Sequence, residues 1–116
     1  VARGNDQRTL RLVPVDPPSL SAERVSALRD HFELITVTAG VRSERGIRST
    51  RGALFTRVSA AARSVGLRDG DVIVEVNGTP ARNAEEAANL VQRAYTSGVV
   101  RLTIERQGEL GYITFR

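Results

Sequence analysis

His31 is the only histidine in the chain, so it is the first residue to consider for catalytic chemistry. A catalytic nucleophile needs an adjacent base, and that base needs a third group that orients it. Asp30 is the neighbouring carboxylate, but adjacent residues of a helix point to different faces, so Asp30 cannot orient the imidazole ring. The absence of cysteine also excludes thiolate catalysis. The sequence therefore predicts a domain without catalytic residues, which is not itself an enzyme.

Asp69 and Asp71 flank Gly70 and are the carboxylates closest to a metal-binding pattern. A calcium loop needs further oxygen ligands and a terminal glutamate, which this segment lacks. Short carboxylates beside a glycine also stabilise turns, because they accept hydrogen bonds from nearby backbone amides. The sequence therefore predicts a turn here, with no metal site and no cofactor.

Five arginines could together contact phosphate groups: Arg42, Arg45, Arg48, Arg51 and Arg57. Binding of single-stranded nucleic acid also uses aromatic side chains that stack on bases, and none lies between positions 42 and 51. All 17 basic residues are arginine, and against 13 acidic residues they give a net charge of +4. Such a mild excess is typical of a solvated surface, so no nucleic-acid partner is predicted.

The length of 116 residues, 41% of them hydrophobic, suits one buried core but not two. No segment approaches the ~20 consecutive apolar residues of a membrane span, so we expect a soluble domain without one. The chain starts at Val1, without a methionine or the pattern of a signal peptide. We therefore expect a processed chain or a fragment of a larger protein.

Residues 66–78, with the sequence GLRDGDVIVEVNG, have the clearest local pattern in the chain. A short helix over residues 60–62 should end at Gly66, where glycine permits a left-handed cap and Leu67 follows as the capping hydrophobe. Residues 72–76 alternate as a strand does, and Asn77-Gly78 favours a tight type I′ turn. The segment therefore predicts a helix end, a turn, a strand and a hairpin in immediate succession.

The first part of the chain predicts two elements before a second strand. Residues 9–15 predict a strand at a sheet edge, because Pro14 cannot donate to a central ladder. The helical spacing of Leu20, Val25 and Leu28 predicts a helix over about 21–30. Residues 32–38 follow as a β-rich run.

The rest of the chain predicts a loop, one well-defined helix and three strands. Residues 41–50 predict a loop with at most one helical turn. Asn83, with Glu86 three residues later, predicts a helix that continues to about residue 95. The remaining strands are predicted over 52–58, 99–106 and 110–115. The fold class is therefore α+β, with five or six short strands in a small, partly closed barrel or sandwich and two main helices.

The motif at residues 66–78 resembles the PDZ family, whose members carry a Gly-Leu-x-x-Gly-Asp-x-Ile-x-x-Val-Asn-Gly run at this point. The resemblance covers residues 30–116, which leaves residues 1–29 as an N-terminal extension with an edge strand and a helix. Residues 47–54 and the closing run 111–116 look most like the last PDZ domain of bacterial HtrA/Deg serine proteases. The residues present contain no protease, so only the parent protein is implied to be one.

The resemblance implies a module that binds protein C-termini by adding the peptide as a strand to a sheet edge. By that resemblance, residues 31–34 form the carboxylate-binding loop, residues 35–38 pair with the peptide, and the helix begun by Asn83 forms the opposite wall. An open apolar groove is therefore expected between the two. The implied peptide-binding residues are Phe32, Glu33, Leu34, Ile35, Thr36, Val37, Ala84, Ala88 and Val91. On the same helix, Ala87, Leu90 and Ala94 are expected to face the core instead.

Glu33 departs from the family pattern, which usually places glycine between the two apolar residues of that loop. A glutamate loses the free access to positive φ that glycine has. It also brings a negative charge near the incoming peptide carboxylate. We therefore expect Glu33 to weaken or alter carboxylate binding.

The resemblance implies a substrate-recruiting or regulatory domain of a periplasmic or other extracytoplasmic serine protease in protein quality control. Partners would be hydrophobic protein C-termini, and other domains or subunits of the parent protease. One alternative is a structural or oligomerisation domain that binds no free peptide. Another keeps the PDZ fold in a site-2-type metalloprotease or a secretion-system component.

Overall fold

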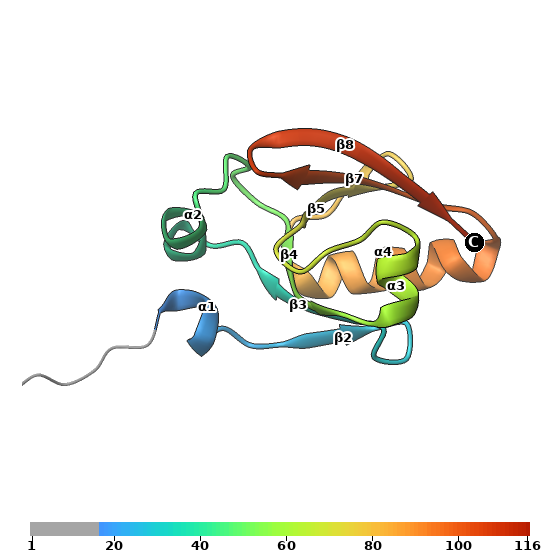
Figure 1. Ribbon diagram of the computed structural model, residues 1–116, viewed down its shortest axis with the longest axis horizontal. Helices are drawn as coiled ribbons and strands as arrows, with labels where there is room; N and C mark the ends of the chain where they lie inside the picture. The colour runs from blue at the N-terminus through green and yellow to red at the C-terminus, as the bar shows by residue number, and fades with distance from the viewer. Residues whose placement is uncertain (1–16) are drawn as a thin grey trace, which may run out of the picture.

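The computed structural model describes residues 17–116, in which seven strands form one antiparallel sheet (Figure 1). The strands are β2 Val25–Ala27, β3 Phe32–Thr36, β4 Ala53–Val58, β5 Val72–Val76, β6 Thr79–Pro80, β7 Val100–Arg106 and β8 Glu109–Phe115. Their order is β2-β3-β4-β5-β7-β8, and β6 pairs with β5. In the described part of the chain β2 and β8 lie at opposite ends of this order, so the sheet is open. The α+β class is confirmed, and the strand predicted over residues 9–15 lies outside the described residues.

Within residues 17–116, four helices accompany the sheet: α1 Pro18–Ser21, α2 Ala39–Arg45, α3 Ala60–Ser64 and α4 Ala84–Ser97. The start of α4 is fixed as predicted, because the Asn83 side chain accepts a 2.8 Å hydrogen bond from the Glu86 N–H. The Glu86 carboxylate accepts bonds from the backbone and guanidinium of Arg82, and this arginine lowers the pKa of Glu86 to about 2. No helix within residues 17–116 is long and apolar enough to cross a membrane.

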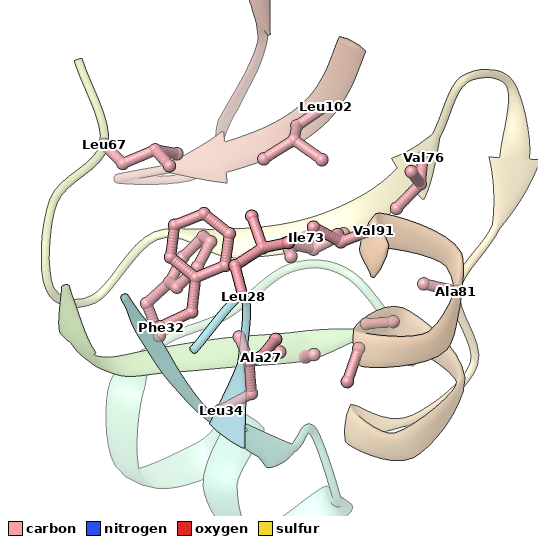
Figure 2. Packing of buried hydrophobic residues seen from close by; sticks show 14 of the residues in the cluster. Ala27, Leu28, Phe32, Leu34, Leu67, Ile73, Val76, Ala81, Val91 and Leu102 are labelled. Carbon is pink, nitrogen blue, oxygen red and sulfur yellow. The ribbon is translucent and has the colours of Figure 1, made fainter. Parts of the chain in front are cut away.

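The main hydrophobic core lies between the sheet and α4. Leu34, Ile73 and Leu102 from three strands meet Val91 from α4 in this core, and all four side chains are fully buried (Figure 2). A smaller cluster beside α2 consists of Ile35, Val37, Val41, Leu54 and Val72. Because alternate residues of a strand point to opposite faces, β3 contributes side chains to both clusters.

The predicted helix end and hairpin around residues 66–78 are both present. Gly66 has φ +104°, and the Leu67 N–H donates to the Ala62 carbonyl at 3.2 Å as α3 ends. Asn77 and Gly78 have φ values of 50° and 83° and join β5 to β6, as a type I′ turn requires. Local turn chemistry therefore determines this part of the chain.

The helix predicted over residues 21–30 is wrong. α1 is a single turn that ends at Ser21, and the chain continues into β2. Val25, Ser26 and Ala27 are half-buried, exposed and buried in turn, which is the period of a strand. Pairing with β3 and burial of Ala27 therefore override the helical spacing.

The segment expected to be mostly a loop contains α2. The Thr38 side chain accepts a 3.2 Å hydrogen bond from the Val41 N–H and caps this helix. Gly46 ends it in the left-handed conformation, with φ +66°. Two turns of helix form because both ends are capped and Val41 is buried.

A buried carboxylate on β7 anchors the loop between α2 and β4. Glu105 is only 4% exposed and accepts hydrogen bonds from the backbone N–H groups of Arg48 and Ser49 at 2.7 and 2.8 Å, and from the Ser49 hydroxyl. Burial raises the pKa of Glu105, but these hydrogen bonds outweigh it, so the pKa lies below its ordinary value. The charged carboxylate therefore holds this loop against the sheet.

Candidate functional site

Strand β3 and helix α4 form the two walls expected from the sequence. Phe32 and Leu34 of β3 lie in the same buried cluster as Ala88 and Val91 of α4. The Thr36 hydroxyl accepts a 3.0 Å hydrogen bond from the Ala84 N–H and so joins the end of β3 to the start of α4. The two walls therefore face each other across a shared apolar interior.

Two other predicted site residues, Ile35 of β3 and Val37 just after it, lie elsewhere. Ile35 and Val37 point into the smaller cluster beside α2, on the opposite face of the strand. On α4, the expected division into core and groove residues is not seen. Ala84, Ala87, Ala88, Val91 and Ala94 are all buried in the main cluster.

The space between these walls is filled by the chain's own β2, so the prediction of an open groove is wrong. β2 pairs antiparallel with β3, with Val25 opposite Leu34 and Ala27 opposite Phe32. It also contacts α4, and Ala27 is 7% exposed within the main cluster. Figure 1 shows β2 running alongside β3 at the edge of the sheet. This edge of β3 already carries an added strand.

A strained turn joins β2 to β3. Leu28, Arg29 and Asp30 are consecutive non-glycine residues with φ values of 50°, 53° and 68°. Each left-handed residue of this kind costs about 1–2 kcal/mol, with aspartate at the low end. The His31 N–H donates to the Leu28 carbonyl at 3.1 Å, and the His31 ring lies 2.7 Å from the Ser59 hydroxyl. The turn is thus held by specific bonds against an unfavourable backbone conformation.

The carboxylate-binding loop predicted over residues 31–34 is therefore wrong in its placement. Phe32, Glu33 and Leu34 belong to β3, and the connecting turn lies just before them. The Glu33 carboxylate accepts a 2.8 Å hydrogen bond from the Thr56 hydroxyl and lies 3.4 Å from Arg24. Glu33 thus links β3 to β4 and to the segment that leads into β2, rather than facing a loop.

A cleft of about 580 Å³ lies beyond the turn, at the end of the groove near the C-terminus. Its apolar lining includes Leu28, Phe32 and Val65, and Gln92 and Tyr95 contribute from the last part of α4. Sequence reasoning missed both this cleft and β2. The period-two pattern of residues 25–27 was the only local signal, and it is too short to outweigh helical spacing.

The two aspartates of the central turn have structural partners, and Asp71 accepts a 3.0 Å hydrogen bond from the nearby Arg68 N–H, as predicted. Asp69 accepts a 2.9 Å hydrogen bond from the Val58 N–H, and the buried Asp71 is paired with the Arg106 guanidinium at 2.7 Å. Across the described residues 17–116, no group of three or more His, Cys, Asp or Glu side chains could hold a metal ion.

The family model for the PDZ domain matches residues 56–106, which include α3, β5, β6, α4 and β7. The chain carries a PDZ domain. The HtrA3 PDZ domain, solved with a phage-derived ligand (FGRWV), superposes on 80% of this chain and 83% of its own length, with a TM-score of 0.60 and 23% identity. The HtrA-type protease AlgW, solved with a decapeptide, superposes on 72% of this chain with a TM-score of 0.62 and 23% identity.

These two similarities establish the PDZ fold. This chain spans only 26% of the AlgW chain, so most of that protein has no counterpart here. No curated protein sequence shows significant similarity to this chain.

Proposed function

We propose that this PDZ domain binds extended protein C-termini with apolar side chains, by adding them as a strand to β3. The main observation in support of this proposal is the position of β2. The space between β3 and α4 accommodates an antiparallel strand, because one lies there with buried side chains. Two proteins of the same fold were solved with peptides bound, which also supports the proposal.

The chemistry of the two walls suits such a ligand. The edge of β3 offers main-chain hydrogen bonds that are independent of peptide sequence. The apolar side chains of Phe32, Leu34, Ala88 and Val91 favour apolar residues at alternate positions. Because the paired segment is short, the affinity should be about micromolar, or ~8 kcal/mol.

The proposal is tested by NMR titration of the full chain and of its Ala27→Lys variant with the pentapeptide FGRWV. In the variant, a charged side chain replaces a buried methyl group and should drive β2 out of the groove. We expect chemical-shift changes at residues 32–36 and 84–95, and a weaker response to the peptide with an amidated C-terminus. Peptide binding that leaves both segments unperturbed, or no binding by either protein at millimolar peptide, would overturn the proposal.

We further propose that the domain is the substrate-recruiting or regulatory part of a larger HtrA/Deg-type serine protease outside the cytoplasm. The similarity of fold to two HtrA proteins supports a protease of this type as the parent protein. Fluorophosphonate labelling of the full-length protein from its source cells tests it, because these reagents react with activated serines. A full-length protein that is not labelled and does not cleave unfolded substrates would contradict this parent.

The filled groove favours a second candidate, a structural domain that binds no free peptide. In that case β2 would be a permanent seventh strand, and the domain would contact other parts of its parent through its outer surfaces. Absence of peptide binding by the intact chain and by the Ala27→Lys variant, together with self-association in analytical ultracentrifugation, would support this candidate instead.

A further inference from the structure

We infer that residues 25–28 act as an internal ligand, which external C-termini must displace from the groove. The inference rests on the proposed function and concerns how the same site is controlled. We call residues 25–28 the internal segment. It runs antiparallel to β3, and its last strand residue, Ala27, lies opposite Phe32 at the start of β3. A C-terminal peptide added to β3 in the same direction would end at this point.

The side chains of the internal segment lie as those of a bound peptide would. Val25 is half-buried, Ser26 is exposed and Ala27 is buried, so alternate side chains face α4. Leu28 follows with 8% exposure and contacts the same cluster as Phe32 (Figure 2). The side chain at the end of the groove is therefore a leucine, at the mouth of the large cleft described above.

This arrangement identifies the ligand class. A chain that ends in a leucine-sized apolar residue, preceded by a small residue, would replace the buried contacts of Leu28 and Ala27 directly. The internal segment continues into the turn and has no terminal carboxylate, whereas an external ligand has one. Such a carboxylate would lie near the cleft wall, where Arg29, His31 and Arg116 contribute polar and cationic groups.

Several features make the internal segment displaceable. Its pairing with β3 covers only three residues on each strand. The ion pair between Arg24 and Glu33 is partly exposed, with side-chain exposures of 36% and 27%, so it contributes little. The turn that follows has three left-handed residues, and opening it would relieve their strain.

The N-terminal side of the segment is held separately. Ser19 of α1 is buried and donates its N–H to the Glu44 carboxylate of α2 at 2.8 Å, and its hydroxyl donates to the same group. Residues 22–24 connect this contact to β2. The internal segment can therefore leave β3 while α1 remains attached to α2, which makes exchange a local movement.

The first test compares Ala27→Lys with Ser26→Lys. Both variants add the same charge to the same strand, but position 27 faces the apolar cluster and position 26 faces solvent opposite Glu33. The probe is a fluorescein-labelled hexapeptide with the sequence of residues 23–28, ERVSAL, and a free C-terminus. A site that is only partly open binds in proportion to its open fraction, so Ala27→Lys should bind about tenfold or more tightly than the intact chain. Ser26→Lys should bind no more tightly than the intact chain, because a lysine opposite Glu33 can only strengthen the pairing of β2 with β3.

The second test closes the groove by a cross-link that can be reversed. Ser26 and Glu33 lie directly opposite each other, and such pairs are about 4.5–5.5 Å apart, within the range of a disulfide. The chain has no cysteine, so the double variant Ser26→Cys/Glu33→Cys can form only this one intramolecular bond. The oxidised protein should bind the hexapeptide about tenfold or more weakly than the reduced protein, and reductant should restore the affinity.

The outcomes separate this inference from the proposed function. Equal binding by the oxidised and reduced double variant, or equal binding by Ala27→Lys and the intact chain, would overturn displacement while leaving peptide binding intact. No binding of either peptide by any of these proteins would overturn the proposed function itself. Tight binding only by the proteins with a released segment would support both.

Discussion

Glycine at position 29 should hold the internal segment more tightly in its groove and so weaken peptide binding. Arg29 has φ 53° in the middle of the turn, where an L-residue costs about 1–2 kcal/mol relative to the right-handed conformation. Glycine removes this cost, but it loses about 0.5–1 kcal/mol more conformational freedom on folding. The net stabilisation of the closed hairpin in Arg29→Gly should be about 0.5–1 kcal/mol.

This net stabilisation predicts two measurable effects, a gain in stability and a loss of affinity for the peptide. The free energy of unfolding in urea should rise by about 0.5–1 kcal/mol. The dissociation constant for the ERVSAL hexapeptide should rise about two- to fivefold, because the open fraction of the groove falls by the same free energy. A stabilising substitution that weakens ligand binding is the specific sign of a groove occupied by its own chain.

Arg29→Ala is the matched control. It removes the same side chain from the cleft wall but retains a Cβ atom and therefore retains most of the backbone strain. If Arg29→Ala weakens peptide binding as much as Arg29→Gly, the lost guanidinium explains the effect and the reasoning from strain fails. It fails equally if Arg29→Gly lowers the free energy of unfolding or tightens peptide binding.

Three further substitutions test the scaffold around the groove. Glu105→Gln should destabilise the fold by about 1–2 kcal/mol at pH 7 in urea titrations. Because folding lowers the pKa of Glu105, its contribution to stability is complete above the ordinary carboxyl pKa and is lost as the pH falls. The difference in free energy of unfolding between Glu105→Gln and the intact chain should therefore narrow below about pH 4. A difference that does not change with pH would contradict this. Gly52→Ala should lower the free energy of unfolding by roughly 2–4 kcal/mol, because φ at this position is +136° and the added Cβ would lie 2.5 Å from the Ile73 carbonyl oxygen. An unchanged melting temperature would refute this prediction. Ser19→Ala should raise the pKa of Glu44 in NMR titrations, because hydrogen bonds from Ser19 are the main cause of its lowering, and an unchanged pKa would exclude that contact.

Sequence reasoning succeeded where the signal is local. Asn83 caps α4, Gly66 ends α3, and Asn77-Gly78 forms the hairpin turn, each through bonds within a few residues of the chain. The family resemblance rested on the same segments, and the match over residues 56–106 confirms it. These features depend on backbone conformations that few residue types adopt, so the residue type alone is informative.

The same reasoning failed for the groove. Phe32, Glu33 and Leu34 are predicted to lie in a carboxylate-binding loop, whereas all three lie in β3. Ala88 and Val91, which are expected to face an open groove, are buried in the main cluster together with Ala27 of β2. The expectation of an open groove is wrong because the partner of the β3 edge is β2 of the same chain.

Much of the PDZ scaffold can be predicted from the sequence, because the alternating strands, the capped helix and the glycine-dependent turns depend on interactions between near neighbours. The occupant of the space between β3 and α4 cannot be predicted in this way. Residues 21–30 carry helical spacing, yet they form β2 and a left-handed turn, because hydrogen bonds to β3 and burial of Ala27 and Leu28 against α4 outweigh local preference. The pairing with β3 joins residues only five to nine positions apart. The burial against α4 depends on a helix that begins at residue 84, and no local pattern encodes that contact.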